Sequence, residues 1–263
     1  MQETSGRLIT RKQDGMGWIV FSNPARRNAM SFEMWRALPE ALGSFARDPE
    51  VRAVVVTGDG ESFASGADIS EFETRRANPA AAAEYNDALD AAYRGLLECP
   101  KPTIARVRRI CVGGGLGLAL SCDVRWCSDD TVFRMPAGRL GLGYAFEGVK
   151  RMVDVIGLAN AADIFFSARK FDAAEALRIG VVNTVRPVAA FDAEFAGYCA
   201  LVAANAPLTL AAAKRAILES SKDPGERNMA LVNAMYEACF ESEDYAEGRR
   251  AFLEKREPVF RGR

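Results

Sequence analysis

Short runs of β-branched and other apolar residues alternate, over most of the chain, with longer segments whose apolar residues recur every three or four positions. The short runs are typical of buried strands, and the longer spacing is typical of amphipathic helices. The predicted strands cover residues 8–13, 17–22, 51–57, 103–107, 124–127, 131–135 and 181–185. From residue 191 onward only the helical spacing continues. We therefore expect an α/β core over residues 1–190 and a helical region over residues 191–263.

Turn and capping residues mark the ends of several of these elements. The Asp-Gly pair at 14–15 predicts a hairpin between the first two strands. Ser31 is a typical N-cap for a helix that continues to about residue 46. Asn78 followed by Pro79 predicts the start of a second long helix.

Three adjacent glycines, Gly113 to Gly115, lie between the strand over residues 103–107 and an apolar helix over residues 116–122. A helix start presents backbone N–H groups without partners in the helix, and glycine lets a ligand approach them closely. The helix dipole adds to their preference for negative charge. The stretch is therefore a candidate anion site, for a resident anion or for one that forms during a reaction.

Three interpretations of the glycine stretch compete. The first is tight packing of a helix against a sheet. The second is a dinucleotide site, but G-x-G-x-x-G fails at Leu118, and no Lys-Ser or Lys-Thr follows as in a phosphate loop. The third is an oxyanion hole of backbone donors, which requires a second donor from elsewhere in the chain.

Composition narrows the classes of function. A net charge of −1 argues against a nucleic-acid partner, and no apolar run approaches the ~20 residues that span a membrane. No signal-peptide core is present, and the six scattered cysteines are typical of reduced thiols, so we expect a cytoplasmic protein. The absence of histidine excludes Ser-His-Asp and Cys-His catalysis and His-ligated metal sites. Acid–base chemistry must fall to Asp, Glu, Tyr, Lys, Cys or bound water.

Five segments in order resemble the crotonase superfamily, the enoyl-CoA hydratase/isomerase family. They are NPARRNAMS (23–31), FASGADIS (63–70), VGGGLGLALSCD (112–123), RLGLGY (139–144) and FDAAEALRIGVVNTV (171–185). The resemblance implies a spiral of β-β-α units with a C-terminal helical region that builds homotrimers, often stacked as hexamers. It also implies an acyl-CoA thioester as substrate, with coenzyme A as part of that substrate and no permanently bound cofactor.

The common step of the family stabilises a thioester enolate between two backbone N–H groups. By position in the motifs, the resemblance assigns these donors to Ala67 and Gly114, which supplies the second donor that an oxyanion hole requires. Asp68 follows Ala67 and is either a helix cap that shapes the loop or a group near the ligand.

The resemblance also implies contacts with coenzyme A. Arg26 and Arg27 occupy the stretch that meets its phosphates, and guanidinium suits phosphate, although a solvated surface pair is the alternative. The other implied contacts are Ala29, Ala64 and Ile69 along the adenine pocket, and Lys255 and Phe260 toward the coenzyme A of a neighbouring subunit.

The chain departs from the family at the two glutamates with which its hydratases add water. By the same resemblance, the first glutamate position is Gly117 and the second, after Pro136, is Ala137. Neither glycine nor alanine can move a proton. Ordinary hydratase chemistry at these two positions is therefore excluded.

Two nearby residues are candidates for the chemistry. Tyr144 lies where a family decarboxylase that acts on methylmalonyl-CoA also carries Tyr; a packed loop aromatic is the alternative. Decarboxylation needs no general base, because loss of CO₂ leaves the electron pair that becomes the enolate. Glu147 could instead shuttle a proton for isomerisation or weak hydration, or simply suit the start of a helix. We expect decarboxylation of a malonyl-CoA-type ester, with isomerisation and acyl-CoA binding without turnover as the alternatives.

Overall fold

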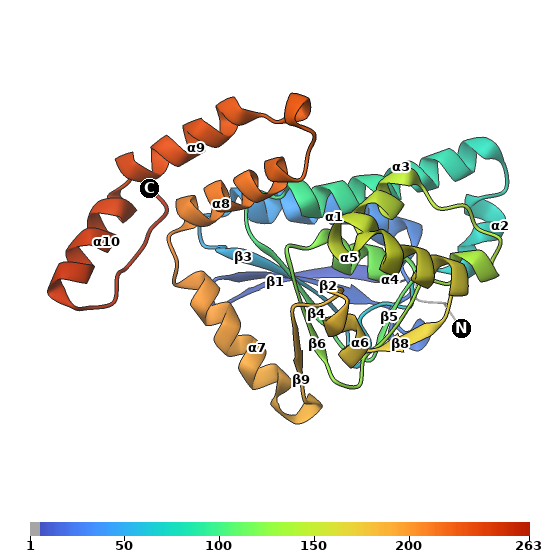
Figure 1. Ribbon diagram of the computed structural model, residues 1–263. Helices are drawn as coiled ribbons and strands as arrows, with labels where there is room; N and C mark the ends of the chain where they lie inside the picture. The colour runs from blue at the N-terminus through green and yellow to red at the C-terminus, as the bar shows by residue number, and fades with distance from the viewer. Residues whose placement is uncertain (1–5) are drawn as a thin grey trace.

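A computed structural model describes residues 6–263 as an α/β fold around a six-stranded sheet (Figure 1). In spatial order the strands are β1 (Arg7–Gln13), β2 (Met16–Ser22), β3 (Ala53–Gly58), β4 (Thr103–Val107), β6 (Val124–Ser128) and β9 (Thr184–Arg186). The β1–β2 hairpin is antiparallel, and every later pair is parallel. A second sheet consists of β5 (Ile110–Val112), β7 (Val132–Arg134) and β8 (Lys170–Asp172).

Helices follow the strands and cover both faces of the main sheet. They are α1 (Phe32–Arg47), α2 (Phe72–Arg75), α3 (Pro79–Glu98), α4 (Gly114–Ser121), α5 (Phe146–Ser167), α6 (Ala173–Arg178), α7 (Val188–Ala203), α8 (Pro207–Ser220), α9 (Met229–Glu241) and α10 (Glu243–Glu254). Short 3₁₀ turns cover Pro24–Arg26, Ile69–Glu71, Ala137–Arg139 and Pro224–Glu226. The order of strand pairs and helices confirms the expected spiral of β-β-α units.

Strand β3 shows why the sheet forms the centre of the molecule. Every residue of β3 is buried, as expected for a parallel strand covered on both faces. Val54 and Val56 belong to the larger apolar core, which includes residues of α1, α3 and α4. Val55 belongs to a smaller core with Phe191 and Phe195 of α7. The alternation of side chains along the strand therefore divides the core into two layers.

Several local predictions are confirmed and a few need correction. The hairpin at 14–15 is present, and the Ser31 side chain accepts a hydrogen bond from the Met34 N–H as an N-cap. Helix α4, however, begins at Gly114 rather than at residue 116, so only Gly113 of the three glycines lies outside it. The short strands β5 and β8 were not predicted. Three-residue strands are too short to show a period of two.

The last four helices divide between the core and a projecting arm. Helix α8 is fixed to the core by Lys214, whose buried Nζ lies 2.8 Å from Asp123 Oδ2 and 3.1 Å from the Lys101 carbonyl oxygen. The projecting arm consists of α9 and α10, which extend from α8 to the side of the molecule away from α2 (Figure 1). The boundary at residue 190 stays a prediction; α7, which begins at Val188, packs on the sheet.

Over residues 6–263, no single helix is both long and apolar enough to cross a membrane. Helices α7 and α8 together have that length and composition, but they are bent by 99° where they meet.

Candidate active site

Two loops meet at the carboxyl ends of the adjacent parallel strands β3 and β4. The first loop leaves β3 after Gly58 and carries residues 59–68, and the second leads from β4 through β5 to Gly113. Backbone hydrogen bonds join them: the Ala64 N–H donates to the Ile110 carbonyl, and the Val112 N–H donates to the Ala64 carbonyl. Segments far apart in the sequence are thus held side by side, at the edge where open parallel sheets bind ligands.

The N–H groups of Ala67 and Gly114 lie next to each other at this junction. Gly66 and Asp68 exchange backbone hydrogen bonds with Met30, so the intervening Ala67 N–H faces the other way. A Cβ placed on Gly114 would be 3.6 Å from the Ala67 nitrogen. Over residues 6–263, neither N–H donates to a backbone acceptor, and Gly114 stands in the first turn of α4. The two residues that the family resemblance assigns as donors are therefore brought together, with N–H groups that have no backbone acceptor.

The backbone of Gly113 makes this geometry possible. Its φ of 54° and ψ of −119° lie in a region that residues with a side chain avoid. The Gly113 N–H donates to the Arg134 carbonyl, which fixes the turn to β7. The sharp turn lets α4 start directly beside the first loop, with its amino end at the Ala67 nitrogen.

Tyr93, a residue of α3 outside the sequence motifs, lies against position 117. A Cβ on Gly117 would be 2.4 Å from the Tyr93 hydroxyl oxygen, so that oxygen already fills the space of any side chain there. The Tyr93 hydroxyl donates to the Gly114 carbonyl over 3.2 Å. Its ring packs edge-on against Trp35, with 5.9 Å between ring centroids. Burial raises the pKa of Tyr93 well above its ordinary value.

A cavity of about 530 Å³ opens beside Gly117 between α3, α4, α5 and α8. Tyr93, Tyr144, Asp90 and Glu147 all line it, so both predicted candidates face the same space. Tyr144 is half-buried and packs edge-on against Phe165, whereas Glu147 is exposed. Burial raises the pKa of Tyr144, which a hydrogen-bonding interaction with Tyr93 partly offsets. Burial also raises the pKa of Asp90.

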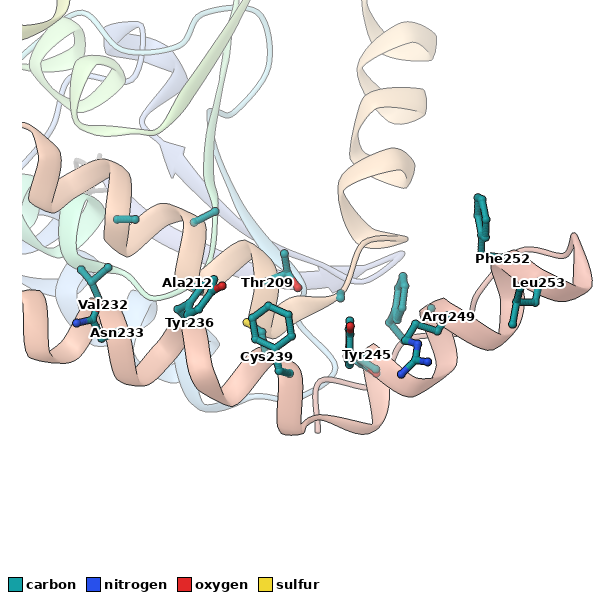
Figure 2. A pocket seen from close by; sticks show the side chains of 17 residues that line it. Thr209, Ala212, Val232, Asn233, Tyr236, Cys239, Tyr245, Arg249, Phe252 and Leu253 are labelled. Carbon is teal, nitrogen blue, oxygen red and sulfur yellow. The ribbon is translucent and has the colours of Figure 1, made fainter.

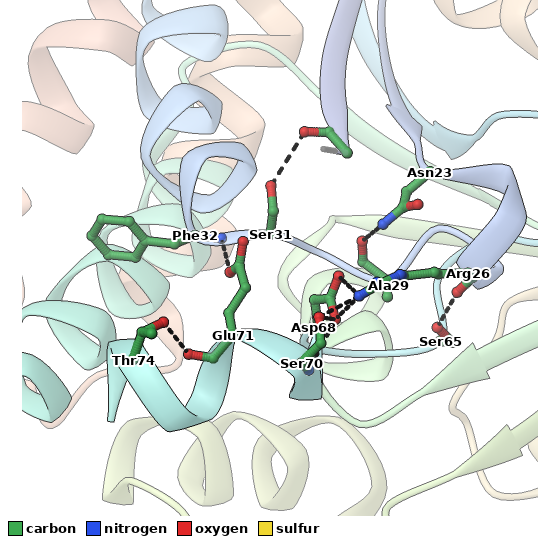
Figure 3. Close-up of polar contacts among 11 residues, drawn as sticks. Asn23, Arg26, Ala29, Ser31, Phe32, Ser65, Asp68, Ser70, Glu71 and Thr74 are labelled. Carbon is green, nitrogen blue, oxygen red and sulfur yellow. Dashed lines mark hydrogen bonds and ion pairs between the residues drawn. The ribbon is translucent and has the colours of Figure 1, made fainter. Parts of the chain in front are cut away.

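The Asp68 carboxylate makes two kinds of structural contact, one with the backbone and one with Arg26. Its Oδ1 accepts from the Ser70 N–H at the start of the short 3₁₀ turn, which is the cap that the sequence suggested. Both carboxylate oxygens also lie 2.9 Å from the Arg26 guanidinium, as Figure 3 shows. The Arg26 side chain further contacts the Ser70 hydroxyl. This cluster fixes the loop immediately after Ala67 and ties it to the segment that precedes α1.

The other predicted coenzyme A contacts differ in how exposed their side chains are. Ala29 and Ala64 are buried, and their side chains are not available at the surface. Ile69 is 57% exposed and Arg27 is exposed, so these two side chains are free to meet a bound molecule. Arg27 lines a hollow of about 510 Å³ together with Asn28 and Arg109.

Lys255 lies at the end of α10, and Phe260 lies in the C-terminal segment after it, where its carbonyl oxygen accepts a hydrogen bond from Arg52 just before β3. Lys255 ends α10 in a left-handed conformation and is exposed. Phe260 lines an apolar groove of about 1060 Å³ between α8, α9 and α10, which Figure 2 shows with Tyr236, Tyr245 and other lining side chains. Within one chain these two residues are therefore not brought to the site.

Over residues 6–263, no group of three or more Asp, Glu or Cys side chains is arranged to hold a metal ion.

Tyr93 and Asp90 were not predicted as site residues because they lie on α3, outside every motif. Their spacing of three on one helix, which places them on the same face, was the one available signal.

The fold and the paired N–H groups define an α/β protein in which two backbone donors meet at a helix start. The chain belongs to the enoyl-CoA hydratase/isomerase family, whose model it matches over residues 11–263.

Relatives and solved structures match this chain over nearly its full length. The chain is 31% identical to a short-chain-enoyl-CoA hydratase of Clostridium acetobutylicum, over 95% of each chain. It is 26% identical to a peroxisomal Δ(3,5)-Δ(2,4)-dienoyl-CoA isomerase of Arabidopsis thaliana, over 92% of this chain and 91% of the other. The crystal structure of an enoyl-CoA hydratase/carnithine racemase from Magnetospirillum magneticum superposes with a TM-score of 0.92 at 35% identity, over 97% of this chain and 96% of the other. Proteins named as a hydratase and as an isomerase thus match this sequence over nearly its full length.

Proposed function

We propose that this protein binds an acyl-CoA thioester and forms its enolate, with the thioester oxygen held by the N–H groups of Ala67 and Gly114. As the enolate forms, negative charge moves onto that oxygen. Two donors fixed in advance bind the charged transition state better than the neutral ground state. The paired free N–H groups are the observation that carries the proposal.

The reaction that suits the rest of the site is decarboxylation of a malonyl-CoA-type ester. The positions that the family resemblance assigns to the hydratase glutamates hold Gly117 and Ala137, and the Tyr93 hydroxyl leaves no room for a side chain at 117. Loss of CO₂ generates the enolate without a base, so the missing carboxylates are compatible with it. In this scheme Tyr144 orients the carboxylate of the substrate so that the breaking C–C bond stands perpendicular to the thioester plane.

Isomerisation through Glu147 is the second candidate, because Glu147 lines the same cavity as Gly117. Its high exposure argues for decarboxylation, since a proton shuttle works best when it is held out of bulk water. Coenzyme A phosphates would meet the guanidinium groups of Arg26 and Arg27, with Arg26 oriented by Asp68. The exposed Ile69 side chain would lie along the adenine.

A mass-spectrometric panel tests these alternatives. The purified protein is incubated with malonyl-CoA, methylmalonyl-CoA, crotonyl-CoA and a 3-enoyl-CoA, and products are followed over time. Loss of CO₂ from the malonyl esters, reduced in Tyr144→Phe and retained in Glu147→Gln, is the expected result. Conversion of the enoyl esters alone, abolished in Glu147→Gln, would establish the isomerase instead. Thermal stabilisation by these esters with no product from any of them would indicate a binding protein.

A further inference from the structure

Tyr93 occupies a position in the candidate site that no motif assigns. Its hydroxyl oxygen stands where the Cβ of a residue at 117 would be, within 2.4 Å of that point. Gly114 and Gly117 are three residues apart on α4 and so lie on the same face of the helix. Because Cα–Cβ bonds in a helix tilt toward its amino end, the space at position 117 that the hydroxyl fills is directed toward the helix start that presents the Gly114 N–H, where the proposed enolate would lie.

The surroundings of Tyr93 hold its hydroxyl in place. Tyr93 is 8% exposed, its ring packs edge-on against Trp35, and its hydroxyl donates to the Gly114 carbonyl. The same peptide segment thus supplies one oxyanion donor and anchors the tyrosine. Removal of the hydroxyl would leave the ring and its packing intact, so the residue is well suited to a substitution that tests chemistry rather than folding.

Two further polar groups line the same cavity as Tyr93. They are Tyr144, and Asp90, which lies one turn earlier on α3 on the face that carries Tyr93. Tyr93 is buried, Tyr144 and Asp90 are half-buried, and Glu147 is exposed. The series runs from the buried end of the cavity to its open side.

We propose that Tyr93 is the catalytic acid that protonates the α-carbon of the enolate, and that Tyr144 and Asp90 return the proton to it. The inference rests on the proposed enolate chemistry and adds the group that completes it. The Tyr93 O–H first turns away from the Gly114 carbonyl to which it donates. A new C–H bond then forms as the electron pair of the enolate moves back to the α-carbon, and the O–H bond of Tyr93 breaks. The resulting tyrosinate takes a proton through Tyr144, and Asp90 exchanges protons with water. One proton is consumed for each CO₂ released.

Burial suits the three groups to this task. A thioester enolate carbon is a far stronger base than a phenolate, so a tyrosine with a raised pKa can still protonate it. The raised pKa of Tyr93 and of Asp90 keeps each group protonated near neutral pH more fully than in water. General acid catalysis of this kind typically contributes about 10²-fold or more to the rate.

The test follows proton transfer separately from decarboxylation. Wild type, Tyr93→Phe and Tyr85→Phe are incubated with propionyl-CoA in D₂O, and uptake of deuterium at the α-carbon is measured by mass spectrometry. The exchange runs the proposed step in reverse through the small ionised fraction of Tyr93, so it is followed over long incubations. Decarboxylation of methylmalonyl-CoA is measured in parallel, as are propionyl-CoA affinity and thermal unfolding. Tyr85 is the matched control because it is a buried tyrosine of the same helix whose hydroxyl accepts from Trp35 Nε1 and does not line the cavity.

We expect Tyr93→Phe to lower deuterium uptake by about 10²-fold or more, with nearly unchanged affinity for propionyl-CoA. Tyr85→Phe should lose stability, because the Trp35 N–H loses its acceptor, but keep the exchange rate. If Tyr93→Phe exchanges and decarboxylates like wild type, the proposed role of Tyr93 is wrong while the decarboxylase stands. If wild type exchanges but does not decarboxylate, and Tyr93→Phe does neither, the acid is supported and the decarboxylase fails. Absence of both reactions in wild type overturns both.

Discussion

At the scale of single residues, the proposed chemistry depends on a few backbone and hydroxyl groups rather than on carboxylates. The Gly114 nitrogen is the most direct of these. Gly114→Pro removes the N–H and distorts the turn at Gly113, since the residue before a proline is restricted in conformation. We expect turnover to fall by about 10²-fold or more, as when an oxyanion donor is lost elsewhere.

Gly114→Ala is the control for that experiment. It retains the N–H but places a Cβ 3.1 Å from the Trp35 ring, a contact that proline shares. A modest loss in the alanine variant and a large loss in the proline variant would assign the effect to the missing donor. Steady-state turnover of whichever ester the substrate panel identifies is the measurement. Equal activity of both variants would contradict the oxyanion assignment.

Buried tyrosines also make stability depend on alkaline pH. Burial raises the pKa of Tyr85 to about 12, whereas an unfolded tyrosine ionises near about 10. Between these values the unfolded chain has lost a proton that the folded chain retains, so the free energy of unfolding falls as pH rises. The full effect of one such group is about 2 to 3 kcal/mol.

Urea unfolding from pH about 8 to about 12 measures this dependence. Below about pH 10 the contribution of Tyr85 should be fully present, and it should disappear as pH rises through the folded-state pKa. Tyr85→Phe removes one ionising group and should make the decline shallower. A decline of the same slope in both proteins would show that Tyr85 ionises equally in the folded and unfolded states.

At the scale of elements, the packing of α3 against α4 sets what position 117 can hold. Alanine is favoured over glycine inside a helix by about 1 kcal/mol, so Gly117→Ala should stabilise an isolated α4. In the folded protein the new Cβ meets the Tyr93 hydroxyl at 2.4 Å and its ring carbon at 2.6 Å. We therefore expect a net loss of about 1 to 3 kcal/mol in unfolding free energy.

A double-mutant cycle in urea checks whether this contact is the cause. In a Tyr93→Leu background the hydroxyl is gone and the space beside position 117 is larger, so Gly117→Ala should become neutral or stabilising. The two positions would then show a coupling energy of about 1 kcal/mol or more. The same loss in both backgrounds would place the strain elsewhere in α4.

The elements that the sequence predicted well are those set by signals between neighbouring residues. The Ser31 cap and the strand over residues 103–107 act over a few residues, and each was predicted within one or two positions. The pairing of Ala67 with Gly114 came from family motifs, because the hydrogen bonds that join the two loops are between distant segments. Tyr93 was not predicted because its role depends on how α3 packs on α4. The spacing of apolar residues along the sequence does not indicate which helices pack against each other.

At the scale of the whole molecule, the projecting arm presents apolar side chains that the described chain leaves uncovered. Phe252 and Leu253 on α10 are 83% and 80% exposed, next to the groove that α8, α9 and α10 form (Figure 2). Isolated large apolar residues are common at a surface, but a contiguous group of them marks an interaction site. We propose that the arm mediates the homotrimer expected from the family resemblance, which would also bring Lys255 and Phe260 to a neighbouring site.

Sedimentation velocity tests this assembly and separates its two consequences. The mass obtained for the wild-type protein should be about three times the 28.6 kDa of one chain, or about six times that value if trimers stack. Phe252→Asp with Leu253→Asp should yield a folded 28.6 kDa monomer, because both side chains are already exposed and the arm is joined to the core through α8. Lys255→Ala should leave the trimer intact but weaken coenzyme A ester binding, since only the neighbouring ligand would lose a contact. A wild-type monomer with full acyl-CoA affinity would show that each site is complete within one chain and that the arm serves another purpose.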